Sequence, residues 1–360
     1  MVGHRGLQFY GLRAGLALCV SSEFRCHPPE HFYFWQLGIG VNAMAWTYFV
    51  VGSGSIGRRH AVNLQDLGKT LTHLPWRGFD AETFSKSVAR CEGQAAVIIA
   101  TATDVRSALV EICASHDAPM YIEKPLAFTQ SEVDAMYSIE LGLQQRSVVG
   151  FMLRYHPLTR FLSEFDGCNF FRMQFEIGHD VRQWRENWSF SKSYAARADG
   201  GGVLLDLCHE IDLAYMICPT LEVSAVTSIG HRDFAGVDFA SNLSLISADG
   251  ATANVAMDYL SPVLIRAGSL VGSTQNVAFS YVDNTATVST AAGVTMHRFT
   301  LERNAMFMDI MRDFTNLVEG IGTAPLPNMP RMDLMRASCS LIAQAWEHRK
   351  FTGTVKVDLE

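Results

Sequence analysis

The chain has 360 residues, of which 48% are hydrophobic and 18% are charged, and its formal net charge is −7. This length and composition predict a globular protein of about two domains and exclude a disordered or fibrous one. The negative charge, together with the absence of any run of lysine and arginine, argues against nucleic acid as a partner and favours small molecules.

The N-terminal stretch differs from the rest of the chain. Residues 32–57 carry no charge and could span a bilayer by length, but five glycines and several polar residues argue against a membrane segment. The apolar stretch GLALCV at 15–20 faintly resembles a signal peptide, yet it is too short for one. We therefore expect residues 1–45 to be an extension outside the fold, with Met44 as the native start, which N-terminal sequencing would test.

Eight cysteines are scattered along the chain without a CxxC pair. This spacing favours reduced thiols in a cytoplasmic protein over a disulfide framework. The pair Cys208-His209 could belong to a metal site together with Asp206, but zinc needs three or four ligands and no second cluster is visible. We expect no metal.

The first half of the chain predicts alternating strands and helices. Residues 47–68 indicate a strand, a glycine turn and a helix that ends at Gly68. The sequence TLTHLPW at 70–76 indicates a second strand, and AAVIIATAT at 95–103 is an unalternating apolar run, as in strands buried on both faces of a parallel sheet. A helix at 104–115, a short strand PMYI and a last strand at 148–157 complete a doubly wound parallel sheet, the predicted domain 46–150.

The second half has a different period. In FFRMQFEIG at 170–178, Phe171, Met173, Phe175 and Ile177 alternate with polar residues, which indicates a strand with one buried face. Further half-buried runs occur near 222–229, 241–247, 252–260, 276–282 and 294–300. Two helices close the chain, at 307–318 and 334–346. The predicted domain 151–360 is therefore α+β with a largely antiparallel sheet.

The turn GSGSIG at 52–57 matches the G-x-G-x-x-G fingerprint of dinucleotide-binding proteins, and it follows a strand and opens a helix. Gly52 permits the tight turn, Gly54 lets the backbone approach a pyrophosphate, and Gly57 lets the helix pack on the strand. We assign Ser55 and Ile56 of this turn, and also Thr101 and Glu123, to the cofactor site.

The fingerprint expects an acidic residue about twenty positions later, to hold the ribose hydroxyls of NAD. The chain has Trp76-Arg77 there. An arginine suits the 2′-phosphate of NADP, whereas a solvated loop charge is the plain alternative. The cofactor is thus NAD or NADP, with a slight preference for NADP.

Lys124 follows the short strand PMYI in the sequence EKP. Ligands of doubly wound sheets bind beyond the carboxyl ends of the strands, so the Lys124 amine is expected beside the reacting part of the cofactor. Burial there would lower its pKa and permit proton exchange. A cis Lys124-Pro125 bond would aim the side chain.

A second cluster follows three glycines at 200–202. Asp206, His209, Glu210 and Asp212 are predicted on one helix, and the first three lie within about one turn. A helical histidine is usually structural, but beside Lys124 and a nucleotide site His209 is the expected proton acceptor or donor.

The order of GSGSIG, EKP, GFMLRYHP and the GGxxxD…HxxD helix resembles the Gfo/Idh/MocA oxidoreductases over about residues 46–350. The resemblance implies a Rossmann domain, a second domain with a large open sheet, hydride transfer between NAD(P) and a sugar or cyclitol carbon, and oligomers joined through that sheet. It also implies that Lys124 assists proton transfer, that His209 is the acid or base, and that Asp206 binds substrate.

The chain departs from the family in one spacing. The family places the aspartate and the histidine four residues apart, whereas Asp206 and His209 are three apart. On a continuous helix this turns one side chain by about 100° relative to the other, which makes the role of Asp206 the less secure of the two.

The segment 180–202 also resembles a branch of the family from surface-polysaccharide gene clusters. It combines aromatic rings with cations, which suits a sugar face plus a phosphate or carboxylate, while a packed loop is the alternative. The residues assigned to substrate are Arg154, His156, Trp184, Arg185, Tyr194, Arg197 and Asp212.

Together these features predict a cytoplasmic homo-oligomer, a dimer or tetramer, that transfers a hydride between NAD(P) and a ring carbon of a sugar, which could be nucleotide-linked or acidic. Two alternatives remain. A regulator could use the fold to bind nucleotide without turnover. A sugar–sugar transhydrogenase would keep its cofactor tightly bound.

Overall fold

The computed structural model describes residues 45–183, 189–321 and 328–359. The expected N-terminal extension lies outside these ranges except for its last residue. No helix within the described ranges is long and apolar enough to cross a membrane.

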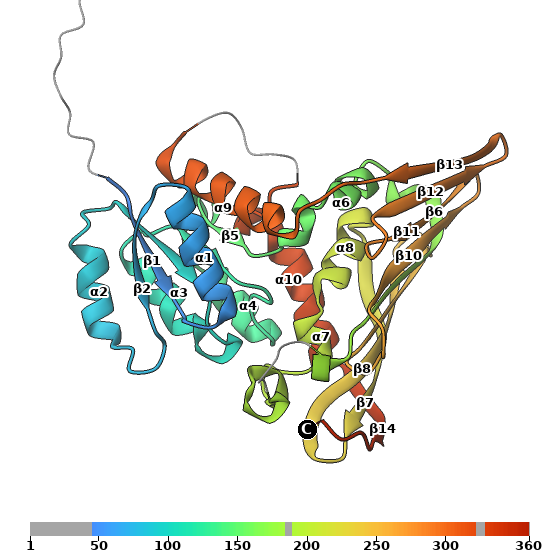
Figure 1. Ribbon diagram of the computed structural model, residues 1–360, viewed down its shortest axis with the longest axis horizontal. Helices are drawn as coiled ribbons and strands as arrows, with labels where there is room; N and C mark the ends of the chain where they lie inside the picture. The colour runs from blue at the N-terminus through green and yellow to red at the C-terminus, as the bar shows by residue number, and fades with distance from the viewer. Residues whose placement is uncertain (1–44, 184–188, 322–327, 360) are drawn as a thin grey trace, which may run out of the picture. The chain divides into compact units, whose positions relative to one another are not determined.

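The first sheet has five parallel strands in the order β2-β1-β3-β4-β5 (Figure 1). Its strands are β1 (Thr47–Val51), β2 (Thr70–Leu74), β3 (Ala95–Ile99), β4 (Met120–Ile122) and β5 (Val148–Val149). Every residue of β3 is buried, as the unalternating run predicted for a strand covered on both faces. The doubly wound sheet is therefore confirmed.

Five helices accompany this sheet along the chain. They are α1 (Ser55–Asp66), α2 (Ala81–Ala89), α3 (Arg106–Ser115), α4 (Gln130–Met136) and α5 (Leu141–Gln145). The helix predicted at 104–115 begins instead with a 3₁₀ turn, η1 (Thr103–Val105). The helix α4 starts with a capping box in which Thr129 and Glu132 satisfy each other's backbone N–H groups.

A helix from the far end of the chain completes one face of this sheet. The helix α9 (Arg303–Glu319) buries Ile310, Met311 and Phe314 in one cluster with Tyr48 and Ile98. Each such side chain contributes about 1.5–3 kcal/mol by leaving water. Gly320 ends this helix in the left-handed conformation, close to the end predicted at residue 318.

The second sheet has nine strands in the order β13-β12-β11-β10-β6-β9-β8-β7-β14 (Figure 1). Its strands are β6 (Phe170–Gly178), β7 (Leu221–His231), β8 (Phe234–Ser247), β9 (Thr252–Asp258), β10 (Ile265–Gly272), β11 (Gln275–Ser280), β12 (Thr285–Thr290), β13 (Gly293–Arg298) and β14 (Arg349–Val355). Only the pairs β6–β9 and β7–β14 are parallel. The largely antiparallel sheet is thus confirmed, although the sequence did not indicate β10, β12 or β14.

The remaining elements connect and cover the two sheets. They are α6 (Pro157–Leu162), α7 (Val203–Asp206), α8 (His209–Ile217), α10 (Met332–Glu347) and the 3₁₀ turns η2 (Met152–Tyr155), η3 (Gly167–Asn169), η4 (Val181–Gln183), η5 (Phe190–Lys192) and η6 (Tyr194–Ala196). The strand predicted at 148–157 is wrong beyond its first two residues, because the chain turns into η2 at Met152.

One buried position on β6 was also predicted wrongly. Phe171 is 55% exposed, whereas Met173, Phe175 and Ile177 are buried. The pairing with β10 shifts here, since Val271 faces Arg172 and Gly272 faces Phe170. Phe171 is therefore the extra residue of a β-bulge, which takes it out of the alternation.

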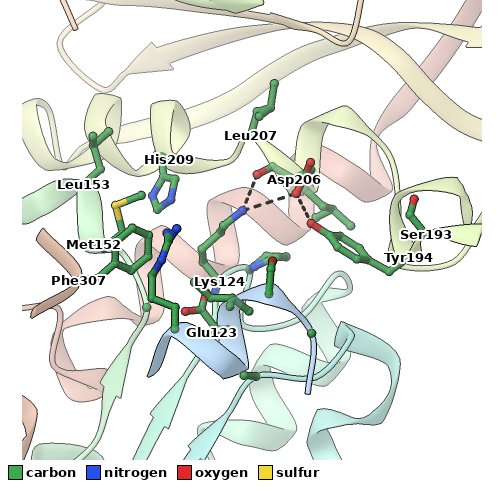
Figure 2. A pocket seen from close by; sticks show the side chains of 18 of the residues that line it. Glu123, Lys124, Met152, Leu153, Ser193, Tyr194, Asp206, Leu207, His209 and Phe307 are labelled. Carbon is green, nitrogen blue, oxygen red and sulfur yellow. Dashed lines mark hydrogen bonds and ion pairs between the residues drawn. The ribbon is translucent and has the colours of Figure 1, made fainter. Parts of the chain in front are cut away.

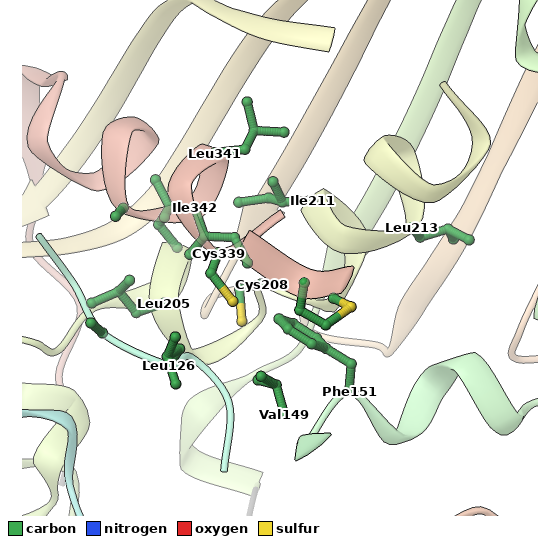
Figure 3. Packing of buried hydrophobic residues seen from close by; sticks show 14 of the residues in the cluster. Leu126, Val149, Phe151, Leu205, Cys208, Ile211, Leu213, Cys339, Leu341 and Ile342 are labelled. Atoms are coloured by element: carbon green, nitrogen blue, oxygen red, sulfur yellow. The ribbon is translucent and has the colours of Figure 1, made fainter. Parts of the chain in front are cut away.

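The two sheets share one core. Figure 3 shows Val149 and Phe151, from the end of the first sheet, packed with Cys208 and Ile211 of the α7–α8 region and with side chains of α10. This packing fixes the N-terminal end of α8 against the carboxyl ends of the strands in the first sheet.

Candidate active site

A cavity of about 1240 Å³ lies beyond the carboxyl ends of β1, β3 and β4. Its lining includes the glycine turn at 52–56, residues 100–103, Glu123 and Lys124 from the first sheet, and Ile177 and Arg266 from the second. Of the residues assigned from sequence, Gly57, Arg154, Arg197 and Asp212 do not line it.

The glycines at one end of the cavity are required by backbone contacts. Gly52 has φ +115°, and a Cβ there would lie 2.3 Å from the carbonyl oxygen of Ala100. A Cβ on Gly57 would lie 1.9 Å from the carbonyl oxygen of Gly52. A Cβ on Gly54 would meet nothing within 4 Å. The turn therefore needs glycine at the first and third positions to bring α1 onto the sheet, and it leaves space at the second.

The first turn of α1 begins beside this space. No side chain caps it, and Ser53, Gly54, Ser55 and Ile56 line the cavity. Uncapped N–H groups at a helix N-terminus form an anion site.

Arg77 lies at the same end of the cavity, after β2. Its side chain is exposed and has no ion-pair partner among the residues described. Trp76 beside it stacks on Phe79 with ring centroids 4.9 Å apart. A free guanidinium is thus available at the cavity wall.

Arg106 joins the ends of two strands, a role that the motif analysis did not predict. Its buried guanidinium donates to the carbonyl oxygen of Thr101 at 2.7 Å and to those of Glu123 and Pro125. Burial lowers the pKa of Arg106 to about 10, against the charge of Glu123. Among the described residues the buried Thr101 hydroxyl has no hydrogen-bond partner, so a polar atom just after β3 is available to a ligand in the cavity.

Glu123 is held in place by a histidine from α1. The Nε2 atom of His60 lies 2.6 Å from Glu123 Oε1, and the Lys124 N–H donates to Glu123 Oε2 at 3.2 Å. Burial acts to raise the pKa of Glu123, but the His60 bond and the charges of His60, Lys124 and Arg106 outweigh it and lower the pKa. A carboxylate is therefore fixed beside Lys124.

Lys124 points from the first sheet toward Asp206 (Figure 2). Its Nζ donates to the carbonyl oxygen of Asp206 at 2.5 Å and lies 3.7 Å from Asp206 Oδ1. Tyr194 donates to Asp206 Oδ1, and Tyr259 donates to Oδ2 at 3.3 Å. The Lys124-Pro125 bond is cis.

The predicted single helix carrying Asp206 and His209 is in fact two. The helix α7 ends at Asp206 and α8 begins at His209, and Leu207 and Cys208 break the regular path between them. The expected rotation of about 100° between the two side chains requires one continuous helix, and Asp206 and His209 lie on separate helices. Asp206 and His209 both line the cavity, and Figure 2 shows both of them near Lys124.

His209 is buried with its ring edge against Phe151, the centroids 5.9 Å apart. Burial lowers the pKa of His209 well below its usual value, and the charges of Lys124 and Arg266 lower it further. The imidazole is therefore neutral near pH 7 and able to accept a proton.

A further wall of the cavity comes from residues that sequence reasoning mostly missed. Arg266 of β10 lies with its guanidinium carbon 5.4 Å from the centre of the Tyr281 ring. Tyr281 also contacts His156, with ring centroids 4.9 Å apart, and the His156 Nε2 lies 3.1 Å from Asn284 Oδ1. All four side chains line the cavity. Of these, only His156 was assigned from sequence.

Three assigned substrate residues have structural partners. Arg154 forms two hydrogen bonds to Asp212, at 2.9 and 2.7 Å, and Ser338 donates to the same carboxylate at 2.7 Å. Arg197 pairs with Asp104 at 2.7 Å. None of the three lines the cavity, and their role toward a substrate stays a prediction.

The aromatic and basic loop is only partly described. Tyr194 lines the cavity together with Lys192 and Ser193. Trp184 and Arg185 lie outside the described residues, and their role stays a prediction.

Solved structures of oxidoreductases share this fold. An inositol dehydrogenase homolog from Azotobacter vinelandii, complexed with NAD+, aligns with a TM-score of 0.66 and 15% identity, over 85% of this chain and 96% of that one. The 3-ketoreductase KijD10 from Actinomadura kijaniata, in complex with NADP and TDP-benzene, aligns with a TM-score of 0.65 and 14% identity, over 86% of this chain and 99% of that one. UDP-N-acetylglucosamine 3-dehydrogenase GnnA from Acidithiobacillus ferrooxidans aligns with a TM-score of 0.63 and 17% identity, over 85% of this chain and 98% of that one.

No family model and no curated protein matches the sequence. At identities this low, structural likeness establishes the fold alone. At that level it confirms the resemblance predicted from the motif order: the chain has the fold of the Gfo/Idh/MocA-type oxidoreductases.

Proposed function

We propose that the protein is an NAD(P)-dependent oxidoreductase that transfers a hydride between the nicotinamide and a ring carbon of a sugar or sugar derivative. The observation that carries this proposal is that Lys124, His209 and the glycine turn line one cavity. A nucleotide site alone would not require a neutral buried histidine beside a lysine at the far end of that cavity.

The residues of the cavity fit a dinucleotide. The open space over Gly54 and the uncapped start of α1 suit a pyrophosphate. The unpartnered Thr101 hydroxyl offers a hydrogen bond at the end of β3. The free Arg77 guanidinium supports our preference for NADP, because it can bind a 2′-phosphate.

When bound, the nicotinamide supplies or accepts the hydride. On the protein side, neutral His209 takes the proton from the reacting hydroxyl as the carbon is oxidised, and it returns that proton in the reverse direction. The Lys124 ammonium donates a hydrogen bond to the same oxygen and stabilises the negative charge that develops on it. Asp206 orients Lys124 through its carbonyl oxygen and carboxylate.

The sugar class is supported by the chemistry of the cavity and by the relatives in fold. Hydroxyl groups need both donors and acceptors, and the walls offer Lys124, Arg266, Asn284 and Ser193. Two of the similar structures are named as a nucleotide-sugar dehydrogenase and a 3-ketoreductase. A nucleotide-linked sugar is accordingly the first substrate class to test.

The test is turnover with both cofactors. The wild-type protein and His209→Gln are supplied with NAD+ or NADP+ and a panel of sugars, polyols and nucleotide sugars, and nicotinamide absorbance is followed. We expect turnover by the wild type and a loss of about 100-fold or more in the variant, with cofactor affinity retained. Cofactor binding without turnover of any member would favour a nucleotide-binding regulator, and cofactor that copurifies with the protein would favour a transhydrogenase.

A further inference from the structure

Two cations line the cavity close enough to His209 for their charges to act on it, and each has its own buried counter-ion. Lys124 lies 3.7 Å from a carboxylate oxygen of Asp206. Arg266 donates from Nε to Glu210 Oε1 at 2.5 Å. The cations at the reacting end of the cavity are therefore compensated by the protein itself.

Glu210 and Arg266 reach each other from different elements. Glu210 belongs to the first turn of α8, directly after His209, and its side chain is only 3% exposed. Arg266 comes from β10, where it pairs with Ile177 of β6, and its side chain is 20% exposed. Arg266 lines the cavity and Glu210 does not. Glu210 thus stands behind the arginine, on the side away from the cavity.

This arrangement sets which substrate groups the wall accepts. A guanidinium is never deprotonated, so it can donate hydrogen bonds to hydroxyl oxygens at any working pH. Its attraction for an anion is reduced by the carboxylate 2.5 Å away. Glu210 Oε2 is buried without a hydrogen-bond partner in the described structure. Burial raises the pKa of Glu210, and the charge and hydrogen bond of Arg266 oppose this shift and favour the carboxylate.

No histidine of this wall restores the positive charge. Burial lowers the pKa of His156 to about 4, and the charge of Arg266 adds to the effect. His209 is neutral for the same reasons. Glu123, the other carboxylate of the lining, is held by His60 and lies near Arg106. The two histidines of this wall are therefore uncharged near pH 7.

We propose that the Arg266–Glu210 pair determines specificity, selecting a ring with neutral hydroxyl groups beside His209 and rejecting one with a carboxylate there. This inference rests on the proposed function and narrows it to neutral sugar rings. A phosphate carried elsewhere on the substrate can pair with Lys192, which lines the cavity as an exposed cation with no ion pair among the described residues.

The chain provides a matched control for removing the counter-ion. Glu210→Gln keeps an oxygen acceptor for Arg266 but removes the negative charge. Asp212→Asn removes a carboxylate that is equally buried and lies on the same helix, but its partner Arg154, unlike Arg266, does not line the cavity. The two variants lose a comparable buried ion pair, and only one of them is next to the cavity wall.

The experiment measures binding by calorimetry to protein saturated with NADPH, so its outcome does not depend on turnover. The probes are UDP-N-acetylglucosamine with its 6-carboxylate analogue, and methyl β-glucopyranoside with methyl β-glucuronide. We expect the wild type and Asp212→Asn to bind the neutral member at least about tenfold more tightly, and Glu210→Gln to lose this preference.

Four results would overturn the proposal: a wild-type preference for the carboxylates, an unchanged ratio in Glu210→Gln, an equal change in Asp212→Asn, or no binding of any probe. Turnover of the probes is assayed separately. An enzyme that oxidises the acidic probe faster keeps the proposed function and refutes the selection by Glu210.

Discussion

Replacing His156 with asparagine should make the protein more resistant to acid. His156 is buried, and its Nδ1 accepts a hydrogen bond from the Leu158 N–H at 3.1 Å, as the cap of α6. Protonation at Nδ1 would break this bond. Burial lowers the pKa of His156 to about 4, with Arg266 adding to the shift and the Asn284 bond opposing it.

Proton linkage determines whether protonation of His156 raises or lowers the stability of the folded protein. An unfolded histidine titrates near pH 6.5, so as the pH falls the unfolded state takes up the proton first. The stability associated with neutral His156 is complete above pH 6.5 and is lost as the pH falls toward about 4. The difference between these two pKa values contributes about 2 kcal/mol to the free energy of unfolding at pH 5. Solvent screening at the cavity reduces this contribution to about 1–2 kcal/mol.

Urea unfolding at pH 7.5 and pH 5.0 measures the effect. Asparagine caps helices well, so His156→Asn should lose little stability at pH 7.5. At pH 5.0 it should gain about 1–2 kcal/mol relative to wild type. His348→Asn, at an exposed histidine after α10, controls for the loss of one imidazole. Parallel acid destabilisation of wild type and His156→Asn would refute the reasoning.

Three further changes test the site. Lys124→Met should lower kcat about 100-fold or more without weakening cofactor affinity, since it removes the proposed donor to the reacting oxygen together with the bond to Asp206; near-normal turnover would contradict that role. Arg77→Ala should weaken NADPH about tenfold in a fluorescence titration and leave NADH unchanged, and equal losses would count against a phosphate contact. Gly57→Ala should abolish binding of both cofactors, because its Cβ would lie 1.9 Å from the Gly52 carbonyl oxygen; retained binding would show that the turn can shift.

The sequence predicted the two sheets because their patterns differ. The run Ala95–Ile99 has no polar residue and must be covered on both faces, whereas β6 alternates and is covered on one. The strand β10 was missed because IRAGSLVG has neither pattern: two of its residues are glycines, and a Cβ at Gly268 would lie 2.4 Å from the Phe279 ring. Such a constraint comes from the neighbouring strand and cannot be seen along the chain.

The same limit applies to the site. Gly52, Lys124 and His209 were found because each lies in a local motif whose chemistry depends on its neighbours in sequence. Glu210 and Arg266 are 56 residues apart, and their ion pair exists only after β10 has packed beside β6. The pairing of Arg154 with Asp212 was missed for the same reason, because a charged residue near a motif does not reveal that it has a buried partner elsewhere in the chain.

The packing of α9 on the first sheet has a consequence for synthesis. Tyr48 and Lys69 both bond to Glu319, and Tyr48 and Glu319 lie 271 residues apart in sequence. While a ribosome is still translating the middle of the chain, the first sheet has one apolar face without its cover of α9, including Tyr48 and Ile98. The first sheet therefore completes its core only when almost the whole polypeptide has emerged, and until then its exposed apolar face favours aggregation of the nascent chain.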